Sequence, residues 1–224
     1  RPFLRHRVPH HAASSGRADG TQLALRKIDY REVPQQMRRW ARMFATTGHY
    51  AMRTELFIVN VATERHVRVD LGEPAYWIIR ILGWHQSGPL FLRMNRAFNQ
   101  LDVVTADPAT GDVRILLSES QKTFVIGAFW EEDRNPFHSL EDDRRFIWES
   151  ERDGWNHLYL YSSNGDLVAR LTEGKFPVER LITVDEKRGW VYFTAHGDAE
   201  NPYASQLYRV SLSGDGFTRL ADNV

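Results

Sequence analysis

Residues 144–161 read R-R-F-I-W-E-S-E-R-D-G-W-N-H-L-Y-L-Y and decide the fold class. The runs 145–148 and 158–161 are rich in aromatic and β-branched residues, which suit a pleated surface. Between the two runs, Arg152-Asp153-Gly154 has the composition of a tight turn. The stretch therefore predicts two antiparallel strands joined by a short turn.

The same strand–turn–strand pattern recurs along the chain. The predicted hairpins are Leu56–Val61 with His66–Val69, Leu101–Ala106 with Val113–Leu117, His157–Tyr161 with Leu167–Leu171, and Gln206–Leu212 with Phe217–Leu220. Their turns, taken at Thr63, Thr110, Gly165 and Gly214, lie 47, 55 and 49 residues apart. A period of about 40 to 50 residues with several short strands per repeat is typical of a β-propeller blade.

Each repeat also contains apolar runs that suit inner strands. These are Trp77–Trp84 with Pro89–Met94, Arg145–Glu149, and Leu181–Asp185 with Trp190–Thr194. We therefore expect an all-β, propeller-like array of about four blades, each a four-stranded antiparallel sheet, over residues 20–224 as part of a larger propeller.

Other stretches are less regular. Residues 1–19 predict an irregular N-terminal segment, Thr21–Ile28 is interpreted as part of a fifth blade, and Val33–Ala51 as a short helix or a loop. Three alternative architectures stay open: a small closed propeller, a two-sheet sandwich, and an arc continued by sequence outside this chain.

The composition favours a β-rich domain without a nucleic-acid or membrane partner. A chain of 224 residues with 42% hydrophobic residues can bury a sizeable core. The 29 basic and 29 acidic residues cancel, so no overall field favours nucleic acid or an anionic membrane. The chain has no cysteine, which excludes disulfides, a thiol nucleophile and thiolate metal ligands.

No apolar run approaches the roughly 18 residues that a membrane helix needs, and residues 1–11 lack the apolar centre of a signal peptide. We expect a soluble protein whose compartment stays open among periplasm, extracellular space and cytoplasm. Because the sequence begins with Arg1 rather than Met, we also expect further sequence upstream.

Several stretches resemble the N-terminal propeller of the dipeptidyl peptidase IV family, which belongs to the prolyl oligopeptidase-like serine peptidases. The resemblance extends from about Ala18 to the C-terminus and is carried by Phe146–Tyr161, Gly165–Gly174, Val184–Ala195, Leu207–Leu212, and Asn95–Asp102 with Ala106–Gly111. It implies a propeller that admits peptide substrates and helps to hold their free amino termini. The resemblance also implies an adjoining α/β-hydrolase domain that performs the hydrolysis.

The chain departs from that family at two points. No Gly-x-Ser-x-Gly nucleophile elbow surrounds any serine, so Ser150, Ser163 and Ser211 are predicted to be strand or turn residues. The family's amine-binding glutamate pair precedes a hairpin that corresponds to Ser15–Gly20, but residues 6–13 contain no glutamate. We therefore expect no catalytic residue in this chain.

The candidate substrate-binding residues are Phe129, Trp130, Glu131 and Glu132. Paired carboxylates beside aromatic rings can hold an ammonium group through charge-assisted hydrogen bonds. The resemblance also implies that the loop around residues 124–130 approaches the substrate channel. The alternative is that the aromatic rings pack between blades and the carboxylates are solvated.

Other candidate residues point to structure rather than chemistry. The histidines His6, His10 and His11 lie in a basic segment poor in carboxylates, which makes a weak metal site, so we expect neither a metal nor another cofactor. The aromatic residues expected to pack between blades are Trp148, Trp155, Trp190 and Tyr192. The polar residues expected to be exposed or paired across a hairpin are Glu149, Glu151, Arg152, Asp153 and His157.

Three functional hypotheses follow. The chain is the non-catalytic propeller portion of a serine exopeptidase, a stand-alone propeller-like module that binds a protein or peptide, or a degenerate relative without peptidase activity. The expected partners are a peptide substrate or protein, and the hydrolase domain of the same parent protein. Exposed strand edges also leave a homo-oligomer open.

Overall fold

The computed structural model describes most of the chain as antiparallel β-structure. The described residues are 21–27, 54–72, 78–85, 88–95, 97–125, 135–142, 144–197 and 201–221. They form fifteen strands, and these described ranges contain no helix. The predicted helix or loop at 33–51 lies outside them.

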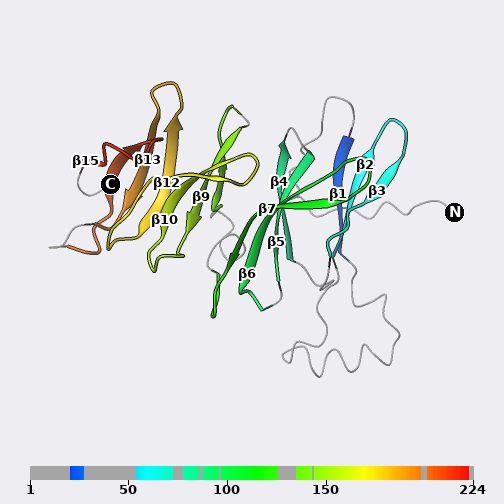
Figure 1. The fold of residues 1–224 in the computed structure, drawn as a ribbon, viewed down its shortest axis with the longest axis horizontal. Helices are drawn as coiled ribbons and strands as arrows, with labels where there is room; N and C mark the ends of the chain where they lie inside the picture. Colours follow the sequence, from blue (N-terminus) through cyan, green and yellow to red (C-terminus); the bar gives the residue numbers. More distant parts are fainter. Residues whose placement is uncertain are drawn as a thin grey trace. The chain divides into compact units, whose positions relative to one another are not determined.

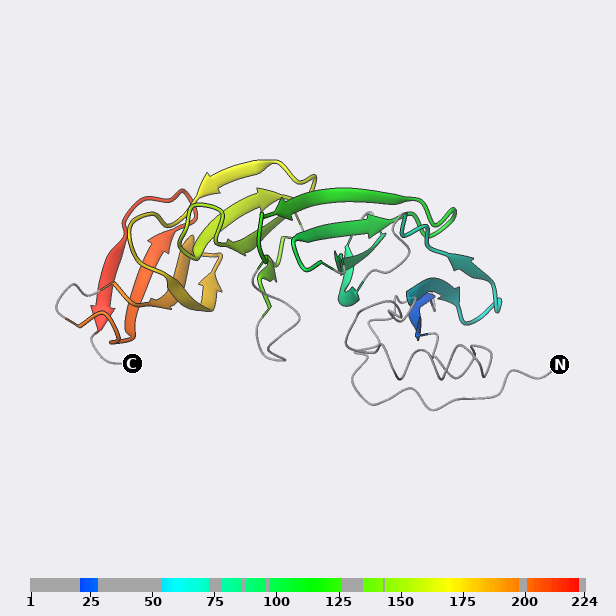
Figure 2. The same cartoon turned by 90° about the horizontal axis from the view of Figure 1, so that it is seen from below.

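The strands form four sheets in which neighbours in sequence are neighbours in space (Figures 1 and 2). The first contains β1 (Thr21–Lys27), β2 (Thr54–Asn60) and β3 (His66–Arg68). The second contains β4 (Ile78–His85), β5 (Gly88–Met94), β6 (Gln100–Ala106) and β7 (Val113–Ser120). The third contains β8 (Phe137–Ser139), β9 (Arg145–Ser150), β10 (His157–Ser162) and β11 (Leu167–Arg170). The fourth contains β12 (Val178–Asp185), β13 (Trp190–Ala195), β14 (Gln206–Ser211) and β15 (Thr218–Ala221).

This topology confirms the predicted all-β, propeller-like array of four blades, with two corrections. The first described sheet has three strands rather than the predicted four. Thr21–Lys27 is not part of a fifth blade, because β1 pairs along its whole length with β2, from Thr21 opposite Asn60 to Lys27 opposite Thr54. The pairing was hidden because a long connection separates the two strands in sequence. The short strand β8 was also missed, since three residues carry no periodic signal.

The chain divides into two compact units, each described here by itself. Unit 1 comprises residues 1–97 and 101–115, and unit 2 comprises residues 98–100 and 116–224. The core of unit 1 joins the first two sheets through apolar side chains, namely Leu56, Ile58, Val69, Leu71, Phe91, Val104 and Ala106. A buried ion pair, Arg93 Nε to Asp102 Oδ2 at 2.8 Å, links β5 to β6 beside this core.

The core of unit 2 lies between the third and fourth sheets. Its buried side chains include Ile147, Leu158, Leu160, Val191, Phe193 and Val210. On the other side of the third sheet, the ring of Phe146 stacks between those of Phe137 and Tyr161. Side chains on both faces of the third sheet are therefore buried.

Turn glycines fit each sheet against the sheet before it. A Cβ at Gly165, in the β10–β11 turn, would lie 1.9 Å from the carbonyl oxygen of Leu116 on β7, and φ of Gly165 is +95°. The equivalent Gly111 would place a Cβ 2.1 Å from the carbonyl oxygen of Arg68, at φ +83°. Only glycine permits both this φ and this close backbone approach. The same close contact between a turn glycine and a backbone carbonyl therefore recurs from one sheet to the next.

Candidate functional site

The predicted substrate-binding residues Phe129, Trp130, Glu131 and Glu132 lie outside the described residues. They belong to the connection from β7 to β8, whose described ends are residues 121–125 and 135–136. What the structure describes is the set of contacts around these two ends.

Antiparallel topology places several connections at one end of the sheets of unit 2. The turn after the second strand of a sheet and the connection that leaves its fourth strand both lie at the same end. That end carries 121–125, 135–136, the β9–β10 turn at 151–156 and the β11–β12 connection at 171–177. We call it the network end. The turn end carries the opposite turns, at 140–142, 163–166, 186–189 and 212–217.

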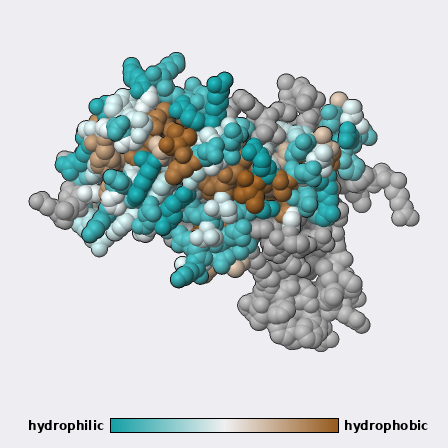
Figure 3. Space-filling view, viewed as in Figure 1, coloured by the Kyte–Doolittle hydropathy of each residue, from teal (hydrophilic) through white to brown (hydrophobic). Residues whose placement is uncertain are grey.

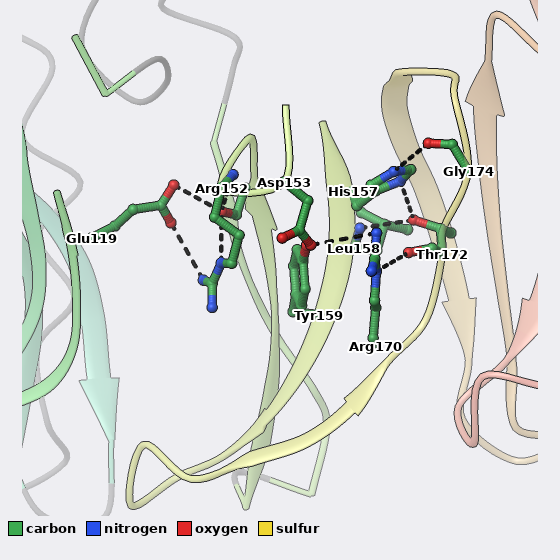
Figure 4. A network of polar contacts seen from close by, with 10 residues as sticks. Glu119, Arg152, Asp153, His157, Leu158, Tyr159, Arg170, Thr172 and Gly174 are labelled. Carbon is green, nitrogen blue, oxygen red and sulfur yellow. Dashed lines mark hydrogen bonds and ion pairs between the residues drawn. The ribbon is translucent and has the colours of Figure 1, made fainter. Parts of the chain in front are cut away.

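A buried carboxylate, that of Glu119 near the end of β7, organises the network end (Figure 4). Its two oxygens accept hydrogen bonds from Trp148 Nε1 at 2.8 Å and from Ser150 Oγ at 2.7 Å. Arg152 Nη2 lies 3.4 Å from the same carboxylate. We call Glu119, Trp148, Ser150 and Arg152 the Glu119 network. It joins β7, β9 and the β9–β10 turn.

The guanidinium of Arg152 is held from several sides. It donates to Ser150 Oγ at 2.9 Å and to the Tyr161 hydroxyl at 2.6 Å, and its Cζ lies 4.4 Å from the ring centroid of Tyr159. Burial by itself lowers the pKa of Arg152. The hydrogen bond to Tyr161 and the negative charge of Glu119 outweigh burial, so the pKa of Arg152 is raised overall. Arg152 is therefore a charged residue whose guanidinium bonds to three other side chains, those of Ser150, Tyr161 and Glu119.

Asp153 fixes the other side of the same turn. Its Oδ2 accepts a 2.5 Å hydrogen bond from the Tyr159 hydroxyl and lies 3.4 Å from Arg170 Nη2. The Tyr159 bond is the main reason why the pKa of Asp153 is lowered. Burial, followed by the bond to Asp153, raises the pKa of Tyr159, so the phenol stays protonated.

His157 is fully buried at the start of β10 and acts as a neutral bridge (Figure 4). Its Nε2 lies 3.1 Å from the Gly174 carbonyl oxygen, which can only accept, so this nitrogen carries the proton. Its Nδ1 then accepts from Thr172 Oγ1 at 3.1 Å. Burial lowers the pKa of His157, which keeps the ring neutral. The residue ties β10 to the β11–β12 connection.

Glu149 completes the paired groups of this region. It is buried, its Oε1 lies 3.0 Å from His138 Nε2, and its Oε2 accepts from Asn156 Nδ2 at 3.2 Å. The expectation that these polar residues are exposed or paired across the hairpin is confirmed for Arg152 and Asp153, which bond to Tyr161 and Tyr159 on β10. Glu149 and His157 are buried instead, and they bond to His138 on β8 and to the β11–β12 connection, respectively.

The other sequence predictions divide. The serines Ser150 and Ser211 lie in strands and Ser163 lies in a turn, as predicted. Trp148 is buried as predicted, whereas the prediction for Trp155 was wrong, because its side chain is 41% exposed at the tip of the β9–β10 turn. Turn chemistry prevailed there over the aromatic preference for burial.

The remaining two aromatic residues of that prediction, Trp190 and Tyr192, are half-buried. The guanidinium Cζ of Arg209 lies 4.3 Å from the Trp190 ring centroid. The guanidinium group of Arg209 therefore covers part of the Trp190 ring.

Two further aromatic residues are exposed at the network end. Phe124 begins the loop that the family resemblance indicated, whereas no sequence pattern pointed to Tyr203. Phe124 is 61% exposed after β7, and Tyr203 is 90% exposed before β14. Other exposed apolar side chains, such as Leu167 and Val168, lie on the outer strand β11. Figure 3 shows hydrophobic side chains in brown among hydrophilic ones on one face of the molecule.

The described polar side chains of the network end are bonded mainly to one another. The acids Glu119, Glu149 and Asp153, the arginines Arg152 and Arg170 and the buried His157 are bonded to other protein groups. Ser150 faces a carboxylate and a guanidinium rather than a histidine base. Within the described ranges, no cluster of three or more His, Cys, Asp or Glu side chains is arranged to hold a metal ion. The same residues contain no helix long and apolar enough to cross a membrane.

Comparison with known proteins agrees with this fold. The family model of the dipeptidyl peptidase IV (DPP IV) N-terminal region matches residues 17–224. A "Probable dipeptidyl peptidase 4" from Emericella nidulans is 37% identical over 173 residues, which cover 70% of this chain and 21% of that protein. A protein of the same description from Aspergillus flavus is 26% identical over 176 residues, covering 75% of this chain and 22% of that protein.

A solved structure shows the same architecture. The crystal structure of Porphyromonas gingivalis dipeptidyl peptidase 4 superposes with a TM-score of 0.66 at 25% identity, covering 76% of this chain and 23% of that one. The chain thus spans about a fifth to a quarter of the length of these relatives. It belongs to the family defined by the N-terminal region of dipeptidyl peptidase IV.

Proposed function

We propose that this chain is the non-catalytic propeller portion of a dipeptidyl-peptidase-like serine exopeptidase, which admits peptide substrates and helps to bind them for a separate hydrolase domain. The observation that carries the proposal is the match of residues 17–224 to the propeller-containing region of that family. The bonded state of the acids and bases at the network end is consistent with a binding role without proton transfer.

The residues proposed to contact the peptide are Phe129, Trp130, Glu131 and Glu132. Their carboxylates would hold the peptide ammonium group and their rings would contact apolar side chains. The residues that flank them belong to the network end, which carries the exposed ring of Phe124. Binding of a peptide by this loop is therefore the property to measure.

The test has two parts. The purified chain is incubated with Gly-Pro-p-nitroanilide, and we expect no release of p-nitroaniline; turnover by the chain alone would contradict the non-catalytic role. Binding of an Ala-Pro-Ala-Ala-Lys peptide is then measured by calorimetry for the natural chain, for the double variant Glu131→Gln/Glu132→Gln, and for Glu64→Gln as a control on an exposed hairpin of unit 1.

We expect the double variant to bind at least about tenfold more weakly, since each charge-assisted hydrogen bond contributes on the order of 1.5–3 kcal/mol. The control should bind like the natural chain. Absence of peptide binding, together with retention of a whole-protein partner, would favour the stand-alone binding module instead.

A further inference from the structure

The β10–β11 turn contains the only asparagine of the chain that is followed by glycine, at Asn164-Gly165. Asn164 is exposed at the turn end of unit 2, and Gly165 has no side chain that could shield its backbone nitrogen. We propose that this pair is a site of spontaneous deamidation, and that the isoaspartate formed there separates the turn from the backbone of β7. The modification does not depend on peptide binding.

The reaction needs only this chain and water. The backbone nitrogen of Gly165 attacks Cγ of Asn164, so a bond forms between these two atoms and the bond from Cγ to Nδ2 breaks. The side-chain nitrogen leaves as ammonia and takes the proton of the Gly165 amide. Water then opens the cyclic imide at either of its carbonyl carbons. One opening gives aspartate, and the other gives isoaspartate, in which the main chain runs through the former side chain.

The equivalent turns lack this chemistry. Ser213 precedes Gly214 in the β14–β15 turn, and Thr110 precedes Gly111 in the turn of unit 1. A hydroxyl side chain has no carbonyl carbon for the following amide nitrogen to attack. Asn164 therefore makes the β10–β11 turn the reactive one among these three.

A second asparagine of the same sheet, Asn156, is protected by its surroundings. It is buried, and its Nδ2 donates to the Val178 carbonyl oxygen at 2.8 Å and to Glu149 Oε2 at 3.2 Å. The next residue, His157, carries a side chain that shields the backbone nitrogen. Asn156 is therefore expected to react much more slowly than Asn164, which makes it an internal reference for the rate.

The fold of the β10–β11 turn cannot accept the isoaspartate product. The amide of Gly165 donates to the Ser162 carbonyl oxygen at 2.9 Å, and the amide of Ser162 donates to the Asp166 carbonyl oxygen at 2.8 Å. The backbone of Gly165 lies so close to β7 that a Cβ there would be 1.9 Å from the Leu116 carbonyl oxygen. Isoaspartate adds a methylene group to the main chain just before Gly165. The longer chain cannot keep both hydrogen bonds and this close approach.

The β14–β15 turn is a matched control inside the same molecule. The amide of Gly214 donates to the Ser211 carbonyl oxygen at 2.9 Å, and that of Ser211 donates to the Asp215 carbonyl oxygen at 2.8 Å, as in the β10–β11 turn. The two glycines also have similar φ values, +89° and +95°. Because Ser213 cannot form the imide, this turn should stay unchanged as the chain ages. A general loss of structure would affect both turns alike.

The first measurement locates the reaction. The natural chain and Asn164→Ser are incubated in mildly alkaline buffer, in which the Gly165 amide loses its proton more readily. Peptide mapping by mass spectrometry, with an isoaspartate-specific methyltransferase as a second readout, identifies the products. We expect conversion at Asn164 to be at least about tenfold faster than at Asn156, and Asn164→Ser to form no isoaspartate in this turn.

The second measurement tests the effect on packing. The modified fraction is separated by ion exchange and compared with the unmodified chain by hydrogen–deuterium exchange. We expect exchange of the Gly165 and Ser162 amides to be at least about tenfold faster, with less than about a threefold change at Gly214 and Ser211. Freshly purified Asn164→Asp, which carries the added charge on an ordinary main chain, should exchange like the unmodified chain.

The absence of conversion at Asn164 would overturn the proposal, as would conversion that leaves exchange at Gly165 and Ser162 unchanged. Equal increases in the two turns would show a general loss of structure and would also overturn it. If Asn164→Asp exchanges as fast as the modified fraction, charge rather than the longer main chain causes the effect, and the proposed separation from β7 by isoaspartate is wrong.

Discussion

In unit 2, the turn end and the network end of the sheets are held by hydrogen bonds of different reach. At the turn end, Asp142 accepts from the amides of Arg144 and Arg145, and Asp185 accepts from that of Arg188, all within three residues. At the network end, Glu119 bonds to Trp148, 29 residues away. The turn end is thus held mostly by local side-chain bonds, although the amide of Glu141 also donates to the carboxylate of Glu186, 45 residues away. The bonds of Glu119 at the network end form only after the sheets have packed.

This difference implies that substitutions at the network end cost more stability and act over a longer distance. Variants at the two ends should therefore differ in unfolding free energy, and the largest difference is expected at Glu119. Each variant is measured on the purified chain.

Among the variants that remove only a polar group or a turn glycine, Glu119→Ala should have the largest effect. It leaves Trp148 Nε1 and Ser150 Oγ buried without their acceptor, and two such losses amount to about 3 kcal/mol of unfolding free energy. Urea titration followed by circular dichroism measures the loss. Asp166→Ala, which removes an exposed bond to Ser162 at the turn end, should cost less than about 1 kcal/mol. Equal losses of unfolding free energy in the two variants would contradict the proposed difference between the two ends.

Gly165→Ala should be the next most damaging, and it is the exception at the turn end. The new Cβ would overlap the Leu116 carbonyl oxygen, so we expect a loss of about 2–3 kcal/mol from positive φ and displaced backbone. Gly154→Ala has a similar φ of +89° but open space, and should cost only about 1 kcal/mol. A difference smaller than the error of the two urea midpoints would show that the close approach does not contribute.

The pH dependence of the unfolding free energy should differ between the two ends by a smaller amount. The depressed pKa of His157 means that its contribution is complete above 6.5, the ordinary value, and declines as the pH falls from there through the folded-state pKa. Asp142 and Asp185 at the turn end also have lowered pKa values, so their contributions decline only below 3.8.

His157→Gln should therefore reduce the change in urea midpoint between about pH 7.5 and pH 5. Asp142→Asn should leave that interval unchanged and alter only the more acidic range. A profile that His157→Gln does not change would assign the near-neutral loss of stability to other groups.

Trp155→Ala should have the smallest effect on stability. The ring is 41% exposed at the tip of the β9–β10 turn, so we expect a loss below about 1 kcal/mol. Trp148→Ala, from the buried position of the same hairpin, should cost about 3–5 kcal/mol. Similar losses would mean that the exposed ring is as important to the fold as the buried one.

Much of the fold could be predicted from local patterns. The hairpins around Gly165 and Gly214 follow from alternating apolar residues and turn residues, and these patterns are local. The pairing of β1 with β2 could not be read in this way, because its partners are separated by residues 28–53. The exposure of Trp155 depends on its place in a turn, which its residue type alone does not indicate.

For the candidate site, the sequence indicated Phe129, Trp130, Glu131 and Glu132, which stay predictions, and it did not point to Glu119. A single glutamate near the end of an apolar strand carries no motif, and its partners follow 29 and more residues later. Its importance depends on which donors the packed sheets bring to it.

By itself, the sequence determined the strands, the turns and the blade period, because each depends on contacts within a few residues. Only the tertiary structure decided that Glu119, Trp148 and Arg152 meet, that His157 is buried with a lowered pKa, and that Gly165 lies against the backbone of β7. The physical reason is that burial and charge compensation are properties of a packed neighbourhood, and segments distant in the chain supply that neighbourhood.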